Sequence, residues 1–522
     1  MNKGTLLWID DEIELLRPHI ILLKEKGYDV DTASNGEDGI ELVKNKHYNV
    51  VFLDETMVGL TGLETLPLIK KIDPTTNVVM VTKNEAESLM DEAIGKSIND
   101  YLTKPVNPAQ ILLTCKKFIE EDKIKQASFI QSFLSGFNQL SQKITFYQNW
   151  EDWVEIYRQL VDWTLELDRI NDTGLEQTLQ DLWKNANTEF AKYVEENYRS
   201  WLTDKPEYGN PPLSPHLLNL YLESALKKGN PVFLIVVDCM RYDQWLTMRD
   251  LLNPYFSIKT DFYSSILPTA TPYARNSIFS GLYPIQIKQH YPQWWNVDSN
   301  SEDHKQNAFE KDLLEAWVER KRIKLKSKYN FIKIFDTDFG RKVEREFNEY
   351  LNNHLTAIVI NAVDMIAHSR SDYAILKEIA PNESAYRSLT RSWFSHSSLL
   401  SILKMISEKK DATVIITTDH GSVRCMRGIQ VLGDKDTSTN LRYKFGKNVK
   451  ADTKNAMLVK NLEEIKLPKQ GISVSNYIAK EDTYFVYPTD YHFYLSKYRD
   501  SFQHGGISLE EMIIPISILE PR

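Results

Sequence analysis

The stretch "VIITTDHGS", from Val414 to Ser422, carries an apolar, β-branched run directly into an acid and an imidazole. "PVFLIVV" (231–237) and "LTAIVIN" (355–361) have the same texture. Continuous apolar runs of this length are typical of strands that a parallel sheet buries on both faces. Open α/β sheets place their sites beyond the carboxyl ends of such strands. The stretch therefore predicts a buried sheet with Asp419 and His420 at the edge where a site would form.

The composition describes a globular chain of several domains. It has 522 residues, of which 42% are hydrophobic and 26% charged, so we expect two to four domains. The net charge of −9 gives no sign of nucleic-acid or anionic-membrane binding. Three widely spaced cysteines, Cys115, Cys239 and Cys425, cannot build a disulfide framework, which fits a reducing compartment.

The first residues, "MNKGTLLWIDDE", lack the apolar run and small-residue cleavage site of a signal peptide. No later run approaches the roughly 18 uninterrupted apolar residues of a membrane span. We therefore expect a cytoplasmic protein.

Three segments differ in texture. Residues 1–120 alternate strand-like runs ("TLLWI", "VVFL", "NVVMV", "DYLT") with amphipathic stretches ("EIELLRPHIILLKEKG", "NGEDGIELVKNKH"), which predicts a parallel α/β sheet. Residues 121–205 carry large residues at helical spacing, which predicts two or three packed helices with breaks near Asn149 and "NDTG". Residues 206–522 return to α/β alternation, with apparent insertions at 283–330 and 424–490.

The first segment gathers polar residues at its strand ends. Asp10 and Asp11 follow the first strand and Asp54 follows "VVFL". Three carboxylates at one sheet edge repel one another unless a hard cation such as Mg²⁺ neutralises them. Thr82 and Lys104, at the ends of the next two strands, could bind phosphoryl oxygens. Solvated caps would explain any one of these residues, but five at matching strand ends favour a site.

This segment resembles the receiver domain of bacterial two-component response regulators, which have a flavodoxin-like fold. The resemblance implies that Asp54 is phosphorylated and that Asp10, Asp11 and Asp54 bind Mg²⁺. It implies that Thr82 and Tyr101 are switch residues and that Lys104 pairs with the phosphoryl group. A sensor histidine kinase is then the expected phosphodonor. Phosphorylation adds about 1.5 to 2 negative charges, which can change the binding surface of such a domain.

The third segment supplies a second set of polar strand ends. Asp364 and His368, at i and i+4, share one face of a helix that follows a strand. Gly421 after His420, and Gly505 after His504, allow sharp turns there. Mixed N/O ligands of this kind suit Zn²⁺, with Mn²⁺ as the alternative. The full set of candidates is Asp238, Thr271, Asp364, His368, Asp419, His420 and His504.

Six ligands and a hydroxyl are too many for one open tetrahedral ion but suit two. Two ions about 3.5–4 Å apart can clamp the attacking and leaving oxygens of a phosphoryl displacement. Thr271 precedes Pro272 at an expected helix start, which favours an anionic phosphoryl group. Any single histidine is more often structural than a ligand, so the prediction depends on the complete set.

This set, with "HGGISLEEMIIP" (504–515), resembles the alkaline phosphatase superfamily and most closely its PglZ branch. The resemblance assigns Asp364, His368 and His504 to one metal. It assigns Asp238, Asp419, His420 and the nucleophile Thr271 to the other. No arginine aligns with the phosphate clamp of the monoesterases, which favours phosphodiesters; Arg275 and Asn276 are the candidate substrate contacts. The expected activity is a zinc-dependent phosphodiesterase or phosphatase, acting on nucleotide or oligonucleotide phosphodiesters.

A receiver, a helical bundle (121–205) and a PglZ domain (206–522) in one chain resemble PorX-type response regulators of the type IX secretion system. This resemblance implies dimerisation on phosphorylation. It also implies contacts with an alternative sigma factor and with the cytoplasmic part of the secretion motor. Neither the substrate nor the sign of regulation follows from the sequence.

Two other functions compete with the enzyme. The chain could be a signalling adaptor whose phosphorylated dimer binds partners while the metals mainly hold the fold. A DNA-binding transcription factor is weakly supported, because no basic helix-turn-helix stretch is evident.

Three further stretches have structural explanations that compete with functional ones. The aromatics of 129–201 are expected to pack a core rather than line a partner groove. Trp294 and Trp295 could stack on a nucleotide base, although ordinary packing explains them equally well. The basic run "NLRYKFGKNVK" (440–450) is expected to be a solvated loop rather than a steering patch.

Overall fold

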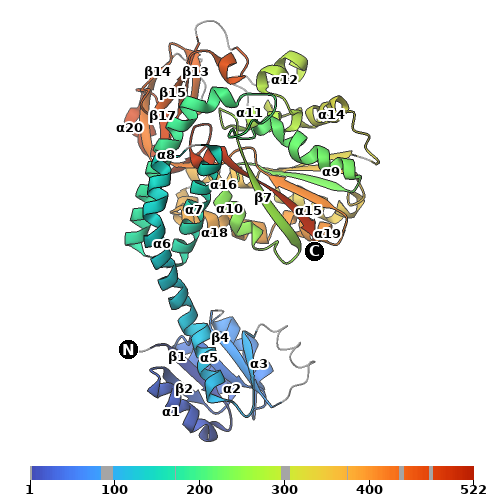
Figure 1. Cartoon of the computed structure of the whole chain (residues 1–522). Coiled ribbons are helices and arrows are strands. Elements are labelled where there is room, and N and C mark those ends of the chain that lie inside the picture. The colour runs from blue at the N-terminus through green and yellow to red at the C-terminus, as the bar shows by residue number, and fades with distance from the viewer. Residues whose placement is uncertain are drawn as a thin grey trace. The chain divides into compact units, whose positions relative to one another are not determined.

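The structure is a computed structural model that describes residues 3–73, 75–83, 98–147, 149–170, 172–295, 306–327, 329–372, 374–433, 440–469 and 474–522 (Figure 1). The chain forms two compact units, residues 1–136 and residues 137–522. Each unit is described by itself.

The first unit is built on a five-stranded parallel sheet of order β2-β1-β3-β4-β5. Its strands are β1 (Thr5–Ile9), β2 (Asp29–Ala33), β3 (Val50–Asp54), β4 (Asn77–Thr82) and β5 (Asp100–Thr103). Helices α1 (Arg17–Glu25) and α5 (Pro108–Cys115) bury one face, with Trp8 and Phe52 in that core. Helices α2 (Gly36–Asn45) and α3 (Gly62–Ile72) bury the other.

The four predicted strands of this unit are confirmed, but β2 has no counterpart among them. Its sequence, "DVDTA", has only two apolar residues, Val30 and Ala33, which are its buried positions, and β2 is an edge strand. The helix predicted over 12–27 is also shorter than expected. A 3₁₀ turn (Ile13–Leu16) precedes α1, which begins at Arg17. Pro18 lies in the first turn of α1, where the helix does not use the backbone N–H that proline lacks.

The predicted helical segment contains α6 (Glu121–Thr145), α7 (Trp150–Ile170) and α8 (Thr173–Trp201). The breaks near Asn149 and 171–174 are confirmed, and Asp172 caps α8 through Gly174 and Leu175. The expectation that its aromatics pack a core is confirmed for α7 and α8. Their buried aromatic residues are Trp150, Trp153, Tyr157, Trp163, Phe190, Tyr193, Tyr198 and Trp201.

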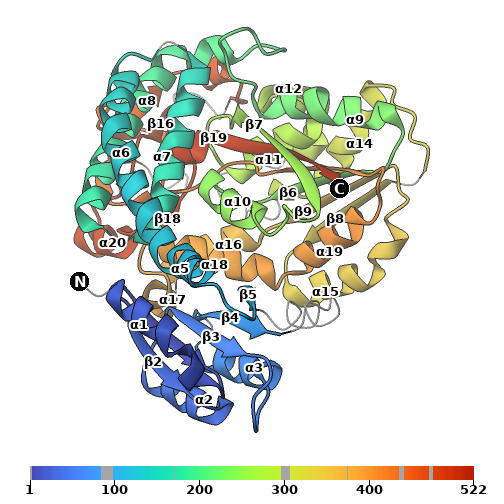
Figure 2. The same cartoon turned by 60° about the horizontal axis from the view of Figure 1, so that its bottom comes forward.

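The main sheet of the second unit has the order β7-β19-β10-β6-β9-β8 (Figure 2). Four parallel strands carry the apolar runs: β6 (Val232–Val237), β8 (Tyr329–Ile334), β9 (Leu355–Ile360) and β10 (Thr413–Thr417). β19 (Ile513–Pro521) runs antiparallel to β10 and to β7 (Phe256–Ser264). β6, β9 and the last four residues of β10 are buried, as the sequence predicts for strands covered on both faces.

Helices cover both faces of this sheet (Figure 2). One face packs against α9 (Glu223–Lys228), α11 (Thr271–Ser280) and α14 (Glu310–Arg320). On the other lie α10 (Tyr242–Arg249), α15 (Thr337–Glu346), α16 (Ala362–Asp372), α18 (Glu383–Ser395) and α19 (Ser398–Ser407).

The stretch predicted as an insertion at 424–490 forms small sheets beside the main one. β12 (Arg427–Leu432) pairs with β14 (Lys450–Ala451) and β17 (Thr483–Val486). β16 (Val474–Ala479) pairs with β13 (Tyr443–Lys447) and β15 (Ala456–Val459). β11 (Val423–Cys425) pairs with β18 (Ser501–Gln503).

The solvated-loop interpretation of 440–450 is wrong for the centre of that run. Arg442 and Lys444 are buried, and the Arg442 guanidinium is satisfied inside the protein by the Glu511 carboxylate at 2.6 Å. A buried arginine requires such a partner. The run therefore anchors the small sheet to the segment after His504.

Candidate metal centres and phosphorylation site

The acids of the first unit lie together at the carboxyl ends of β1 and β3. Asp10, Asp11 and Asp54 each place a carboxylate oxygen within 4.8 Å of the others. Lys104 reaches between them, with Nζ 2.9 Å from Asp10 Oδ2 and 3.0 Å from Asp54 Oδ1. Burial raises the pKa of Asp54 to about 6, with Asp10 adding to the effect against the opposing Lys104. Acids crowded in this way suit a hard divalent cation.

The predicted switch residues occupy different settings at the same sheet edge. Thr82 ends β4 and donates its hydroxyl to the Glu55 carboxylate. Tyr101 lies on β5 and is 42% exposed. The two side chains thus lie on neighbouring strands, and their switch role stays a prediction.

Asp238, Asp419 and His420 form a buried group at the carboxyl ends of β6 and β10. Their ligand atoms lie within 4.8 Å of one another. Cys239 has a positive φ of 64°, and its N–H donates to Asp419 Oδ1 at 3.3 Å. The His420 N–H donates to the same oxygen at 3.1 Å, whereas Asp419 Oδ2 is buried without a hydrogen bond. One carboxylate oxygen is therefore fixed by the main chain and the other is left for a cation.

Thr271 joins this group as the first residue of α11. Its Oγ1 lies 3.0 Å from His420 Nε2 and 3.5 Å from Asp238 Oδ1. His420 Nδ1 lies 3.0 Å from the Gly421 carbonyl oxygen, which can only accept, so Nδ1 carries the proton. Burial lowers the pKa of His420. The imidazole is therefore neutral at neutral pH and presents a bare Nε2 to Thr271.

Burial also raises the pKa of Asp238 well above its ordinary value, against the opposing charge of Arg275. The pKa of Asp419 is raised for the same reason. If both were ionised, the two buried carboxylates would exceed the single positive charge of Arg275 that they share. A divalent cation would remove that excess, since unpaired buried charges are costly.

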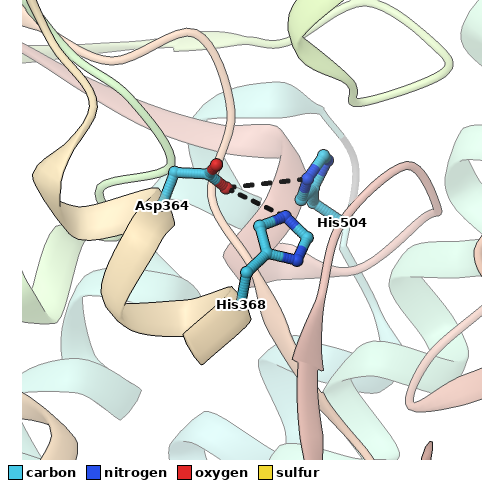
Figure 3. A group of neighbouring side chains, drawn as sticks. All are labelled: Asp364, His368 and His504. Carbon is cyan, nitrogen blue, oxygen red and sulfur yellow. Dashed lines mark ion pairs between the residues drawn. The ribbon is translucent and has the colours of Figure 1, made fainter. Parts of the chain in front are cut away.

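Asp364, His368 and His504 form a second group (Figure 3). Asp364 Oδ1 lies 3.3 Å from His368 Nε2 and 3.7 Å from His504 Nε2. Burial opposes ionisation, but His368, His504 and His420 together hold the pKa of Asp364 below its ordinary value. The His368 side chain is 44% exposed, so this group faces solvent whereas the first is enclosed.

The two groups adjoin each other. The rings of His420 and His504 stack with centroids 4.2 Å apart and planes 18° apart, and those of His368 and His504 meet edge to face at 5.5 Å. The donors are three carboxylates, three imidazoles and a hydroxyl, the mixed N/O set that zinc prefers. The orphaned Asp419 Oδ2 and the clustered donors fit a centre for two metal ions.

The predicted substrate contacts lie inside the protein. Arg275 is buried, with Nη1 2.7 Å from Asp238 Oδ2 and Nε 2.6 Å from Glu310 Oε1. Asn276 is buried and donates to the carbonyl oxygens of Pro272 and Gln306. In the structure both side chains make their contacts to the chain itself.

Glu310 and Asn307 border the site and were not predicted from the sequence. They lie within the apparent insertion at 283–330 and belong to no recognisable motif. Contacts formed between such distant segments leave no local pattern to detect.

Glycines shape the two histidine turns for different reasons. Gly421 does not have a positive φ; a Cβ there would lie 1.9 Å from the Glu510 carbonyl oxygen, so it is required by close packing. Gly505 has a φ of 117°, which glycine adopts without strain, and a Cβ there would meet Tyr443. The predicted freedom to turn is thus confirmed at Gly505, whereas Gly421 fits its neighbours by size.

Comparisons with known proteins agree with this arrangement. The family model described as "BREX system PglZ alkaline phosphatase-like domain" matches residues 217–518. The response regulator receiver model matches residues 6–116, and the PorX response regulator linker model matches residues 123–202.

Since the PglZ match spans more than half of the chain, the protein belongs to the PglZ family of alkaline phosphatase-like proteins. The receiver, linker and PglZ models in this order match a PorX-type response regulator. Its fold is a flavodoxin-like receiver, a helical linker and a large α/β domain. Among the described residues, no helix is both long and apolar enough to cross a membrane.

Similar individual proteins align with the receiver part. The chain is 32% identical over 127 residues to the uncharacterized transcriptional regulatory protein YkoG of Bacillus subtilis, covering 24% of this chain and 55% of YkoG. It is 32% identical over 113 residues to PilG of Pseudomonas aeruginosa, covering 21% of this chain and 84% of PilG. The chain thus spans about half the length of YkoG. A CheY-like receiver from Methanospirillum hungatei matches with 24% identity and a TM-score of 0.23, covering 23% of this chain and 98% of that one.

Proposed function

We propose that this response regulator is phosphorylated on Asp54 and that its PglZ domain is a two-metal phosphodiesterase with Thr271 as nucleophile. The observation that carries the proposal is the position of Thr271 Oγ1, 3.0 Å from His420 Nε2 at the edge of a six-ligand set. We place the domain boundaries near residues 120 and 205.

In this proposal Asp238, Asp419 and His420 hold one zinc ion and Asp364, His368 and His504 hold the other, with manganese as the alternative metal. Bound metal would ease deprotonation of the hydroxyl and neutralise phosphate charge. Thr271 begins α11, so the positive end of the helix dipole would favour an anionic group there. The Thr271 oxygen would bond to phosphorus as one ester oxygen leaves and takes up the proton that the Thr271 hydroxyl gives up. Water would then hydrolyse the bond between Thr271 and phosphorus, releasing a phosphomonoester and restoring the hydroxyl.

Phosphodiesters suit this site better than monoesters. Arg275 is the arginine nearest to Thr271 in the sequence, and it is held by Asp238 and Glu310. It is therefore not available to bind the second negative charge that a phosphate monoester carries.

Nucleotides or oligonucleotides remain the diesters that the family resemblance implies. The aromatic residues near the nucleophile do not add to this, because Tyr273 is buried and Trp294 and Trp295 pack, partly buried, against the core of the main sheet.

The test is hydrolysis by zinc-loaded protein. We expect turnover of bis-p-nitrophenyl phosphate and of a dinucleotide, loss of activity on metal removal, and at least a hundredfold loss in Thr271→Ala. Thr337 is the matched control, because it also begins a helix, α15, but is exposed. Wild-type turnover in Thr271→Ala would refute the role of Thr271.

The receiver supplies control in this proposal. A sensor histidine kinase phosphorylates Asp54 with Mg²⁺ held by Asp10, Asp11 and Asp54, and Lys104 pairs with the phosphoryl group. Thr82 and Tyr101 then change position and the protein forms a homodimer. The linker match to PorX supports a role in type IX secretion, with an alternative sigma factor and the secretion motor as partners. Light scattering with and without acetyl phosphate tests dimerisation, and Asp54→Ala should remain monomeric.

The exposed Tyr101 at the receiver edge also favours a second function, that of a signalling adaptor. An adaptor would keep signalling in cells when Thr271 is replaced by Ala but not when Asp54 is. A hydrolase-dependent regulator would lose its output in both variants.

A further inference from the structure

Glu310 is a buried carboxylate outside the predicted ligand set, and three side chains converge on it. Arg275 Nε donates to its Oε1 at 2.6 Å, and Asn307 Nδ2 donates to the same oxygen at 3.0 Å. Lys333 Nζ lies 2.6 Å from Oε2. Glu310 is the first residue of α14, where the helix dipole favours a negative charge. The carboxylate is thus fixed from three sides.

Two of these contacts lead to the metal centre. Arg275 continues to Asp238, with Nη1 2.7 Å from Oδ2, so Asp238 Oδ1 is the oxygen left facing Thr271 and His420. Asn307 continues to the nucleophile, because its Nδ2 also donates to the Thr271 carbonyl oxygen at 3.2 Å. Glu310 therefore determines the position of a ligand through one neighbour and of the nucleophile through the other.

The charges along this path alternate from Lys333 through Glu310 and Arg275 to Asp238. Arg275 Nε also lies 3.9 Å from Asp419 Oδ2, the oxygen without a hydrogen bond. If Glu310 were neutral, Arg275 would pair only with the carboxylates of Asp238 and Asp419. It would then compete with a cation for both carboxylates and repel it. Removing the Glu310 charge should therefore weaken metal binding, although Glu310 is not itself a ligand.

We propose that Glu310 is a positioning residue of the metal centre: it holds Arg275 and Asn307 so that Asp238 and Thr271 stay available to the metal. This inference rests on the proposed function of the site. It gives the apparent insertion at 283–330 a role, which is to supply a counter-charge from behind the site.

The test compares Glu310→Gln with Glu315→Gln, which changes an exposed carboxylate on the same helix. Native mass spectrometry counts the bound zinc, and competition with a chromogenic chelator gives its affinity. We expect two zinc ions in the wild type and the control. In Glu310→Gln we expect the affinity for one of the two zinc ions to fall by roughly 10 to 100 fold, the range seen when the outer partners of metal ligands are changed. We also expect kcat to fall, while KM stays within about threefold of the wild-type value.

Lys333→Gln separates this role from a structural one. Lys333 Nζ also donates to the Asn307 carbonyl oxygen at 2.5 Å, a hydrogen bond that an amide can keep. The change removes the positive charge on the far side of Glu310, so the hold on Arg275 strengthens and zinc affinity should stay equal or rise. A tenfold fall in zinc affinity in this variant would overturn the proposal, and Lys333→Gln decides the question if Glu310→Gln fails to fold by circular dichroism. Wild-type zinc affinity in a folded Glu310→Gln also overturns it while leaving the proposed function intact. A wild type that binds no zinc overturns both.

Discussion

Glu510 provides a quantitative test of how helix α8 is coupled to the PglZ domain. The residue lies in α21 (Leu509–Met512) and accepts a hydrogen bond from Asn187 Nδ2 of α8 at 3.1 Å. It borders a cavity of about 500 Å³ between the linker helices and the PglZ domain. Burial, with Glu383 nearby, raises the pKa of Glu510 from 4.5 to about 7. Between about pH 4.5 and pH 7, the Glu510 carboxyl therefore keeps its proton in the folded protein but has released it in the unfolded chain.

A carboxyl whose folded pKa is raised stabilises the protein fully below its unfolded pKa and loses that contribution as the pH rises through the folded pKa. A shift from 4.5 to about 7 makes the wild type about 2.5 kcal/mol less stable at about pH 8 than at about pH 5. This is an upper bound, because the side chain is partly exposed. Glu510→Gln keeps an acceptor for Asn187 and removes the titration.

The assay is the melting temperature of the second unit, residues 137–522, in the full chain. An unfolding entropy of about 2.1 cal/mol/K per residue makes 1 kcal/mol worth roughly 1.2 °C for a unit of about 400 residues. We subtract the melting temperature of the wild type from that of Glu510→Gln at each pH. We expect this difference to be about 3 °C larger at about pH 8 than at about pH 5. The exposed Glu408→Gln is the control. A difference that does not change between these pH values would refute the reasoning.

Three further outcomes follow from single contacts. Arg387→Ala should destabilise the second unit by about 3 kcal/mol in thermal melts, because its guanidinium joins Asp168 of α7 at 2.7 Å to Asp243 of α10 at 3.0 Å in a buried network. Gly421→Ala should lower the zinc content measured by mass spectrometry, since a Cβ there would collide with a backbone carbonyl and displace the adjoining histidine. Asp54→Asn should abolish labelling by acetyl phosphate in a phosphate-affinity gel, while unchanged labelling would point to another acceptor.

The clustering of the residues at both candidate sites could be predicted from the sequence because most of them follow recognisable strands. Asp54 ends a run of apolar residues, Asp238 directly follows one, and Asp419 follows one after two threonines; the burial of these runs requires a sheet. Once those runs are parallel strands, their carboxyl ends meet at one edge, and the side chains there must come together. The i and i+4 spacing of Asp364 and His368 made a shared helix face equally predictable.

The edge strand β2 and the basic run around Arg442 show where this reasoning stops. A half-exposed strand has a weak apolar pattern, and a buried arginine looks like a surface arginine until its partner is known. Glu511, the partner of Arg442, is 69 residues away in the chain. No local pattern records such a pair.

The sequence by itself determined the α/β pattern of the two sheets, because burial periodicity marks their strands. The seven residues of the proposed two-metal centre and the acids around Asp54 were predicted from residue types at strand ends together with the resemblance to the PglZ branch and to receiver domains. Only the tertiary structure decided that Arg275 faces inward, that Asn307 joins Glu310 to the Thr271 carbonyl oxygen, and that Asn187 of α8 contacts Glu510. These contacts depend on side-chain packing between distant segments, and a one-dimensional pattern does not encode which surfaces of two elements meet.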